Sequence, residues 1–381
     1  MRKPMAFHEG CAGSMTSAPI VHLVAGARPN FMKIAPLWHE LSTASWCTPR
    51  IVHTGQHSDL NMSDWFFRDL KLPAPHHHLR ARTGSHAELT GTSMIAYEKL
   101  CKDERPAWTI VVGDVDSTLA CSVAAKKLGI SVAHLEAGLR SFDWSMPEEI
   151  NRMVTDRISD LLWTPSPDGD ENLLREGVSP DRIERVGNIM IDSLVMVQPS
   201  ISAVDTAAVV GRELPSQYAV ATLHRPSNVD SAERLALIVE ALNALAERLL
   251  VIFPIHPRTR MRLKTFGLMP RLSAENIIFL DPLGYIEFMA LLHAARLILT
   301  DSGGIQEETT YLGVSCLTLR DNTERPITVT MGTNRLTRLE TLMSDVAAAL
   351  EAPASQRRSI PYWDGRTAGR VAASLRRRIE G

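Results

Sequence analysis

Short apolar runs alternate with helix-length amphipathic segments along most of this 381-residue chain. Each run has the length and the nearly continuous apolar character of a strand buried on both faces, which is typical of parallel sheets covered by helices. The runs form two series, the first at 20–26, 50–55, 108–114 and 131–138 and the second at 218–224, 249–256, 276–281, 296–301 and 314–320. The alternation predicts an α/β chain that contains two doubly wound domains.

A break at 187–216, where prolines and a glycine interrupt the pattern, separates the two series. We therefore expect an N-terminal Rossmann-like domain over 19–187 and a C-terminal one over 188–365, joined by a short linker. In such folds ligands bind outside the carboxyl ends of the strands. The two sets of strand ends are therefore expected to face one another across a central cleft.

The first 18 residues mix charged residues with glycine and serine and lack the continuous apolar core of a signal peptide. We expect residues 1–18 to be a disordered leader. No run approaches the roughly 18–20 apolar residues of a membrane span. The five cysteines are scattered and lack metal-finger spacing, which is typical of reduced thiols in a cytosolic protein.

The charge balance restricts the class of ligand. A formal net charge of -2 gives no global basic field that would attract nucleic acid or an anionic membrane, so neither is expected as a partner. Any anionic ligand must therefore be held by a local cluster. The triplet His76-His77-His78 follows a proline-rich segment and is expected in a loop, and three adjacent histidines cannot all face one ion, so we expect no metal.

Two segments that follow apolar runs are candidate anion sites. Arg28 and Lys33 begin a helix after the first run, where they either bind a phosphate or belong to a solvated helical turn. The segment Ser302-Gly303-Gly304 leads from a strand into a helix, whose free N–H groups attract anions. Glu308, two turns later, can accept hydrogen bonds from a ribose. The alternative for this second segment is an ordinary serine-capped helix.

Other cations also lie at strand ends or in loops, and each taken alone is more often structural or solvated than functional. Together they would line a diphosphate site, where each charge-assisted hydrogen bond contributes about 1.5–3 kcal/mol. These residues are His224, Arg225, His256, Arg258, Arg320 and Arg325.

The N-terminal domain supplies the carboxylates. Asp114 and Glu136 lie at the ends of buried strands, where desolvation is expected to raise the pKa and suit the group to proton transfer. Glu148 follows a helix-starting proline, with Arg152 one turn later on the same face. The latter two residues are either part of the site or a surface i,i+4 pair. Motifs for a P-loop, a dinucleotide-binding turn and a serine hydrolase are absent.

Several ordered motifs in this chain resemble the non-hydrolysing UDP-N-acetylglucosamine 2-epimerase family of bacteria and archaea, over roughly residues 20–380. They are GARPNFMKIAPL, TGQHSDLNMS, VVGDVDST, HLEAGLRSF, MPEEINRMVTDRIS, VGNIMID, LHRPSNVD and LTDSGGIQEE followed by RDNTERP. The resemblance implies a GT-B-like pair of domains whose last helix, here within 366–381, crosses back to the first domain. It also implies a homodimer and no cofactor.

The resemblance further implies a mechanism that inverts C2 of the sugar by eliminating UDP to a 2-acetamidoglucal and adding it back. Asp114, Glu136 and Glu148 match the acid/base carboxylates of the family, and His224 matches the histidine near the departing diphosphate. The residues that match substrate contacts are Arg28, Lys33, Arg152, His256, Phe288, Ser302, Gly303, Gly304, Glu308 and Arg325.

The substrate is left open by departures from the family pattern. Val115 and Asn30 differ from many members, and the TGQHSDLNMS segment looks more like the archaeal and acetamido-uronate branch. The sugar is therefore UDP-GlcNAc or a relative such as UDP-2,3-diacetamido-glucuronic acid. A hydrolytic variant that releases ManNAc, a GT-B glycosyltransferase and a non-catalytic sensor are the other interpretations. Gln56 and His57 match a region involved in activation by UDP-GlcNAc in bacterial members, and activation stays open.

Overall fold

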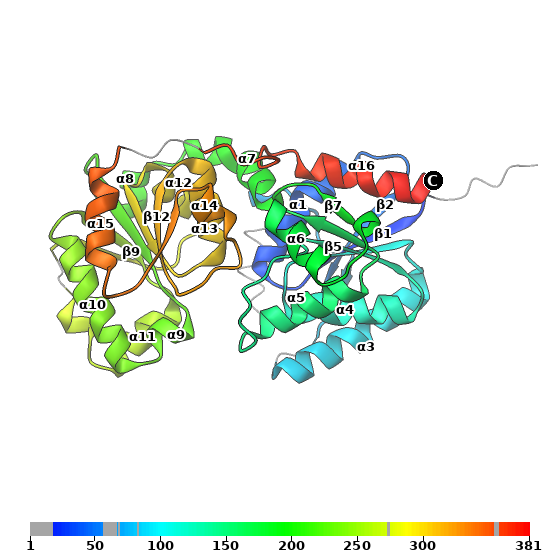
Figure 1. Ribbon diagram of the computed structural model, residues 1–381, viewed down its shortest axis with the longest axis horizontal. Coiled ribbons are helices and arrows are strands. Elements are labelled where there is room, and N and C mark those ends of the chain that lie inside the picture. The colour runs from blue at the N-terminus through cyan, green and yellow to red at the C-terminus, as the bar shows by residue number, and fades with distance from the viewer. Residues whose placement is uncertain (1–17, 56–66, 68, 82–83, 273–274, 354–357) are drawn as a thin grey trace, which may run out of the picture.

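The structure is a computed structural model that describes residues 18–55, 67, 69–81, 84–272, 275–353 and 358–381. The chain forms two lobes, each built around one sheet (Figure 1). The predicted leader lies outside the described residues except for Ala18. Within the described residues, no helix combines the length and the apolar character needed to cross a bilayer.

The first lobe contains a seven-stranded sheet in the order β3-β2-β1-β4-β5-β6-β7, in which every pairing is parallel. Its strands are β1 (Ile20–Ala25), β2 (Thr48–His53), β3 (His77–His78), β4 (Trp108–Val112), β5 (Ser131–Leu135), β6 (Leu161–Thr164) and β7 (Ile183–Arg185). Its helices are α1 (Arg28–Ser42), α3 (His86–Glu104), α4 (Asp116–Lys127), α5 (Pro147–Ile158) and α6 (Pro167–Arg175).

The second lobe contains a six-stranded parallel sheet in the order β10-β9-β8-β11-β12-β13. Its strands are β8 (Tyr218–Thr222), β9 (Leu250–Pro254), β10 (Ile277–Leu280), β11 (Leu297–Thr300), β12 (Ser315–Leu319) and β13 (Asn334–Thr337). Its helices are α8 (Thr206–Val210), α9 (Pro226–Val229), α10 (Ala232–Ala246), α11 (Pro257–Thr265), α12 (Tyr285–Ala294), α13 (Gly303–Leu312), α14 (Ile327–Thr330) and α15 (Leu342–Glu351).

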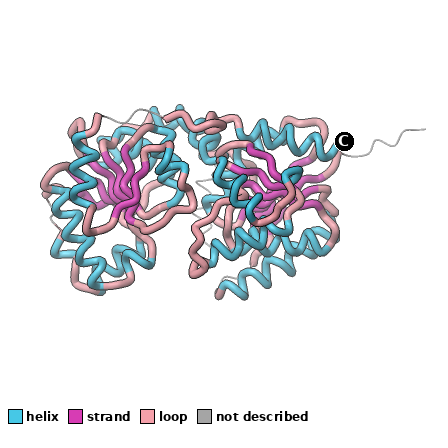
Figure 2. The backbone as a smooth tube through the Cα atoms, in the orientation of Figure 1, coloured by secondary structure: helices cyan, strands magenta, loops and turns pink. Residues whose placement is uncertain are grey.

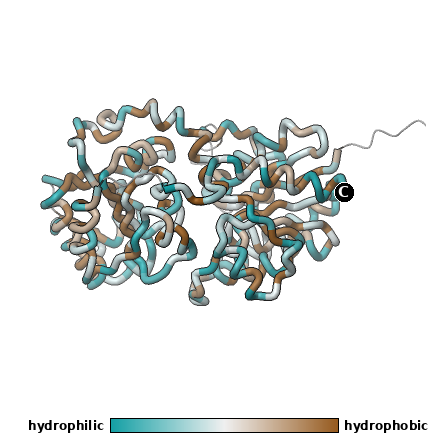
Figure 3. Tube along the Cα trace, turned by 45° about the horizontal axis from the view of Figure 1, so that its top comes forward, coloured by the Kyte–Doolittle hydropathy of each residue, from teal (hydrophilic) through white to brown (hydrophobic). Residues whose placement is uncertain are grey.

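Helices flank both sheets, and the most hydrophobic stretches of the chain include the strands at the centre of each lobe (Figures 2 and 3). This arrangement confirms the two doubly wound α/β sheets predicted from the alternating pattern. Four strands were not predicted, namely β3, β6, β7 and β13. The strands β3, β7 and β13 are short and contain polar or exposed residues, which weakens their pattern, whereas β6 is buried and mostly apolar but only four residues long.

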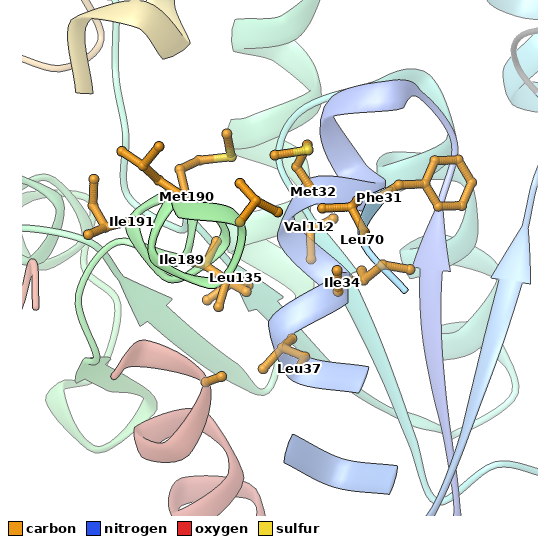
Figure 4. Close-up of a cluster of buried hydrophobic side chains, with 14 of the residues drawn as sticks. Phe31, Met32, Ile34, Leu37, Leu70, Val112, Leu135, Ile189, Met190 and Ile191 are labelled. Carbon is orange, nitrogen blue, oxygen red and sulfur yellow. The ribbon is translucent and has the colours of Figure 1, made fainter. Parts of the chain in front are cut away.

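Helix α7 (Ile189–Ser202) connects the lobes and lies within the segment where the sequence predicted a short linker. This helix packs against α1 of the first lobe and against α12 and α13 of the second. Figure 4 shows Ile189 and Met190 of α7 beside Met32 of α1, within one buried apolar cluster. Because α7 is apolar around most of its surface, it is buried between helices of both lobes and does not act as a loose tether.

Helix α16 (Thr367–Glu380) packs against α1 and α7. The indole Nε1 of Trp163 in β6 donates to Ser374 Oγ over 2.9 Å, which joins this helix to the first sheet. The backbone N–H of Ala368 donates to Asp192 on α7 over 2.8 Å. The domain limits at 187 and 365 stay predictions, since α7 and α16 both bridge them.

Candidate active site

Both sheets reverse their strand order beside the first strand of the lobe, between β1 and β4 in one and between β8 and β11 in the other. Such reversals open a crevice at the carboxyl ends of the strands, where ligands of doubly wound folds bind. Asp114 follows β4, His224 follows β8 and Ser302 follows β11. Three of the predicted site residues therefore lie at the switch points of the two sheets.

Lys33 and Glu136 form a buried ion pair in the first lobe, through Glu136 Oε2. Lys33 comes from α1 and is 7% exposed, while Glu136 follows β5 and is 3% exposed. Glu136 has a φ of 71°, a left-handed backbone conformation that is costly for a residue other than glycine and is found most often at functional sites. The pair is thus held in place by surrounding structure at the carboxyl edge of the sheet.

Asp114 is bound by Arg152, whose Nη2 lies 2.7 Å from Asp114 Oδ2. Burial raises the pKa of Asp114, but Arg152 and Lys33 outweigh burial and hold the pKa below its ordinary value. The expectation of a raised pKa at Asp114 was therefore wrong, because the carboxylate is paired with a guanidinium. Asp114 is ionised at neutral pH in this structure.

Arg152 does not form the surface pair with Glu148 that was one of its two interpretations. It is 2% exposed and binds the neighbouring Glu149, which also accepts hydrogen bonds from the backbone N–H of Ser141 and Phe142. Glu149 therefore has a structural role.

Glu148 is exposed on the first turn of α5 and acts electrostatically on Arg225 of the second lobe. Burial and the neighbouring Arg320 lower the pKa of Arg225, while Glu148 is one of three carboxylates that oppose this effect. Glu148 of the first lobe thus lies toward the second.

His224 is anchored by Asp301, with Nδ1 2.9 Å from Oδ1. Asp301 is fully buried and also accepts hydrogen bonds from the backbone N–H groups of His224 and Arg225 and from Asn228. Burial raises the pKa of Asp301, but its pairing with His224 and these hydrogen bonds hold the pKa below its ordinary value. The ring of His256 lies 5.5 Å from that of His224 between centroids, so both predicted histidines belong to one group.

The turn before α13 has the features of an anion site. Ser302 is the N-cap of α13, but its side chain makes no cap hydrogen bond, so the interpretation of an ordinary serine cap does not hold. A Cβ atom on Gly303 would lie 2.6 Å from Glu324 Oε1 and 2.8 Å from Arg325 Nη1, whereas Gly304 has open space around it. The start of α13 at Gly303 is thus packed against the side chains of Glu324 and Arg325.

Arg325 joins the two lobes electrostatically. Burial lowers its pKa, but carboxylates from both lobes reverse this effect and raise the pKa above its ordinary value. Those carboxylates are Glu307 and Glu324 of the second lobe and Glu136 and Asp114 of the first. The strand ends of the two lobes therefore face one another around Arg325, as the sequence predicted.

Glu308 is buried on α13 and accepts a hydrogen bond from Tyr285 Oη over 2.8 Å. Burial raises the pKa of Glu308 to about 7, and Glu307 also contributes. Phe288 lies one turn after Tyr285 on α12 and is partly buried against the apolar cluster. The structure thus places Glu308 beside the anion site and Phe288 on a neighbouring helix.

Several predicted residues lie outside the site or outside the described residues. Arg28 begins α1, but its side chain, like all of Gln56 and His57, lies outside what the structure describes. His77 and His78 form the edge strand β3, so the predicted loop was wrong there, and among the described residues no three His, Cys, Asp or Glu side chains form a candidate metal site. Arg258 pairs with Asp230.

The sequence interpretation missed Glu307, which is 1% exposed and binds Asn188 over 2.9 Å and Arg325 over 2.9 Å. It stands next to Glu308 in the same motif, but its partner Asn188 lies 119 residues away. Only the three-dimensional arrangement identifies Glu307 as part of the site.

Comparison with known proteins gives matches over nearly the whole chain. The model of the family described as UDP-N-acetylglucosamine 2-epimerase matches residues 39–376. A UDP-N-acetylglucosamine 2-epimerase of Methanocaldococcus jannaschii is 41% identical over 93% of this chain and 98% of its own. A UDP-2,3-diacetamido-2,3-dideoxy-D-glucuronate 2-epimerase of Pseudomonas aeruginosa is 42% identical over 82% of this chain and 86% of its own.

The fold agrees with these matches. The crystal structure of the M. jannaschii UDP-GlcNAc 2-epimerase in complex with UDP-GlcNAc and UDP has a TM-score of 0.86 and 40% identity, covering 94% of this chain and 99% of that one. The GT-B-like architecture and the family resemblance expected from the sequence are both confirmed. The family match and these relatives show that the chain belongs to the UDP-N-acetylglucosamine 2-epimerase family.

Proposed function

We propose that this chain is an isomerase that interconverts UDP-GlcNAc and UDP-ManNAc by inverting C2 of the sugar. The observation that carries the proposal is the position of Arg325, which lies among Asp114 and Glu136 of one lobe while bordering the anion-binding turn of the other. Proton-transfer groups and diphosphate-binding groups are thus brought together where a sugar joined to a diphosphate needs both.

The reaction proceeds in two balanced halves. A carboxylate takes the proton from C2, the C2–H electron pair forms the C1–C2 double bond, and the C1–O bond breaks to release UDP. UDP then adds back to C1 while a second group returns a proton to the opposite face of C2. Asp114, Glu136 and Glu148 are the three acid/base groups, and two of them must lie on opposite faces of the sugar.

The departing diphosphate gains negative charge, which the second lobe is built to stabilise. The N–H groups that follow Ser302 and the guanidinium of Arg325 supply donors, and His224, oriented by Asp301, supplies a proton. Arg28, Lys33 and Arg152 add positive charge from the first lobe. His256 lies beside His224 on the same side.

The nucleoside end of the substrate is assigned to α12 and α13. Glu308, held by Tyr285, accepts hydrogen bonds from the ribose hydroxyls, and Phe288 contacts the uracil. Because Glu308 is buried, a ribose hydroxyl bound there would donate to a carboxylate that is shielded from solvent.

A second candidate substrate is a UDP-sugar with an additional carboxylate, such as UDP-2,3-diacetamido-glucuronic acid. The P. aeruginosa relative named for that sugar is 42% identical to this chain. Burial and the like charge of Arg320 lower the pKa of Arg225, and Nη1 of Arg320 is buried without a hydrogen-bond partner among the described residues. A sugar carboxylate would provide that partner.

The decisive test is incubation with each UDP-sugar in D2O, followed by NMR of the product. We expect deuterium at C2 and formation of the C2 epimer with one substrate of the panel. Unchanged, unlabelled sugars would overturn the proposal. Free ManNAc with UDP would indicate the hydrolytic variant, a product that depends on an acceptor would indicate a glycosyltransferase, and tight binding without exchange would indicate a sensor.

We also propose a cytoplasmic homodimer that supplies sugars for cell-surface polysaccharides. The cysteines among the described residues are free and buried, which suits a reducing compartment. Three exposed apolar side chains, Ile95 on α3 and Ile150 and Val154 on α5, suit a face between two copies. Light scattering of the purified chain would test this, and a monomeric mass would exclude the dimer.

A further inference from the structure

Gln306 is a fully buried amide on the first turn of α13. Its Nε2 donates to the backbone carbonyl of Ser302 over 3.3 Å, at the start of the anion-binding turn. Its Oε1 accepts a hydrogen bond from Thr323 Oγ1 over 2.7 Å and another from Asn334 Nδ2 over 3.0 Å. One side chain therefore joins the anion-binding turn to the segment after β12 that carries Arg325.

The backbone of Arg325 is held on both sides by hydroxyl groups of this network. Its N–H donates to Thr323 Oγ1 over 3.1 Å, and its carbonyl accepts from Thr328 Oγ1 over 2.8 Å. Thr328 Oγ1 also accepts from Asn334 Nδ2 over 3.1 Å, the same amide that donates to Gln306. Both backbone polar groups of Arg325 are thus linked to Gln306 through one or two side chains.

The guanidinium of Arg325 lies beside the other part of the proposed diphosphate site. A Cβ atom on Gly303, the first residue of α13, would lie 2.8 Å from Arg325 Nη1. Arg325 is 9% exposed, and its Nε lies 2.9 Å from Glu307 Oε1 on the same helix. The network around Gln306 therefore holds the backbone of a residue whose charged end packs against the anion-binding turn.

A polar network at this place has a specific physical effect. Burying amide and hydroxyl groups is unfavourable unless each finds a partner, and the buried side-chain polar atoms of Gln306, Thr328 and Asn334 all have one. Such a network specifies one arrangement of its members, because a displacement leaves a buried group unpaired. Residues 320–325 lie outside helices and strands, so these side-chain hydrogen bonds fix their position relative to α13.

We propose that Gln306 is a positioning residue of the epimerisation, which sets the spacing between the anion-binding turn and Arg325 so that both act on one diphosphate. This inference rests on the proposed function. The diphosphate gains negative charge as the C1–O bond breaks, and donors already in place stabilise that charge without reorganisation. A displaced guanidinium would therefore weaken the hold on the terminal phosphate more than the hold on the nucleoside.

The test compares the affinities of UDP and UMP by calorimetry. UMP lacks the terminal phosphate, so the ratio of the two dissociation constants measures what that phosphate contributes. Gln306→Met keeps a side chain of similar size and removes its hydrogen bonds. The ratio should fall by about tenfold, which is the effect of losing one charge-assisted hydrogen bond, while the affinity for UMP should change by less than about threefold.

Thr309→Val is the matched control. Thr309 is also fully buried on α13, but its hydroxyl donates within the helix, to the carbonyl of Ile305 over 2.7 Å. Its replacement removes a buried polar group from the same helix without removing a hydrogen bond to Thr323 or Asn334. The ratio of UMP to UDP dissociation constants should therefore keep its wild-type value.

Thr323 allows the same test at a partly exposed residue. Thr323→Val removes the hydroxyl that joins Gln306 to the N–H of Arg325, so it should also lower the ratio. Thr323→Ser keeps the hydroxyl and should restore the wild-type ratio, which a loss of general stability would not do.

The kinetic counterpart is a split between kcat and KM. In Gln306→Met, kcat for C2 deuterium exchange should fall by about 10- to 100-fold, because a small misplacement of a charged group lowers transition-state stabilisation steeply. KM should change by less than about threefold, since most of the nucleotide contacts remain.

Equal losses of UDP and UMP affinity in Gln306→Met would show that the residue only stabilises the fold, and would overturn the inference. A wild-type ratio in Thr323→Val would overturn it as well, even if Gln306→Met did not fold. A wild-type chain that binds UDP but exchanges no proton at C2 would remove the proposed function alone, because the ratio is measured without turnover.

Discussion

Asp301 Oδ1 lies 2.9 Å from Nδ1 of His224, and the carboxylate that makes this contact is fully buried. A carboxylate partner fixes a proton on Nδ1 of the imidazole, which leaves Nε2 as the nitrogen available for the proposed proton transfer. The same pairing of a histidine with a buried carboxylate orients the imidazole in hydrolytic triads.

Replacing Asp301 with Asn should therefore impair turnover more than binding. The amide leaves His224 in the wrong tautomer, and we expect kcat to fall by about 10²- to 10⁴-fold. UDP affinity from calorimetry should change by less than about threefold, which is well under 1.4 kcal/mol. Asp230→Asn is the matched control, since Asp230 forms its ion pairs with Arg258 and Arg262 in the same lobe. Equal kcat values for the two variants would refute the role of Asp301.

The same variant should change the pH dependence of stability. Folding lowers the pKa of Asp301 below the ordinary value of an aspartate. The ionised carboxylate therefore stabilises the native state at pH values above the ordinary pKa, and this stabilisation is lost as pH falls through the pKa of the folded state. At pH 7 we expect Asp301→Asn to lower the free energy of unfolding by about 1–3 kcal/mol. Urea titrations at several pH values should show this difference shrinking in acid. A constant difference would contradict the assignment.

Glu136→Gln and Asp114→Asn should each lower the rate of C2 deuterium exchange by about 10²- to 10⁴-fold. Neither change removes a donor to the diphosphate, so both variants should still bind UDP. Exchange rates from NMR and affinities from calorimetry would check this pair of expectations. Wild-type rates in both variants would mean that the acid/base roles are wrongly assigned.

Gly303 and Gly304 offer a matched comparison at the anion-binding turn. A Cβ atom on Gly303 meets Glu324 Oε1 at 2.6 Å, so Gly303→Ala should lower the free energy of unfolding by about 1–3 kcal/mol. Gly304→Ala places its methyl group in open space and should be neutral or stabilise by up to about 1 kcal/mol through helix propensity. Denaturant titration of both variants tests the contrast, and equal losses would mean that the contact is relieved by side-chain movement.

Ser374→Ala tests how α16 is joined to the first lobe. The change leaves the buried indole N–H of Trp163 without its acceptor, which should cost about 1–3 kcal/mol in the free energy of unfolding. Ser344→Ala, on the exposed side of α15, is the control and should change stability by less than about 0.5 kcal/mol. If the two variants were equally stable, a water molecule would have to satisfy Trp163.

The site was predictable where it follows from strand order. Asp114, His224 and Ser302 each come directly after an apolar run, and parallel sheets place such positions at one edge whatever the detailed packing. The folded chain confirms the two sheets and the facing of their strand ends around Arg325. The local sequence pattern was enough to predict these positions because the topology of a parallel sheet places the residues that follow its strands at one edge.

The local sequence pattern did not predict which site residues are buried or paired where this depends on the helix face or on a partner far away in the chain. Glu148 and Glu149 are adjacent in sequence, yet the second is buried against Ser141 and the first is exposed, a difference set by about 100° of rotation about α5. Glu307 became visible as a site residue only through Asn188, far away in the chain. The pKa of Asp114 likewise depends on Arg152, which burial alone does not reveal.

The position of α16 has a consequence for biosynthesis. The helix made last, Thr367–Glu380, supplies Val371 and Leu375 to the apolar cluster that also contains Leu37 of the helix made first. The ribosome therefore completes the second lobe's sheet while the first lobe still lacks part of its own core. During translation, part of the apolar core of the first lobe therefore stays exposed until residues more than 300 positions later have been synthesised. This exposed surface makes the first lobe a candidate for chaperone binding in the nascent chain.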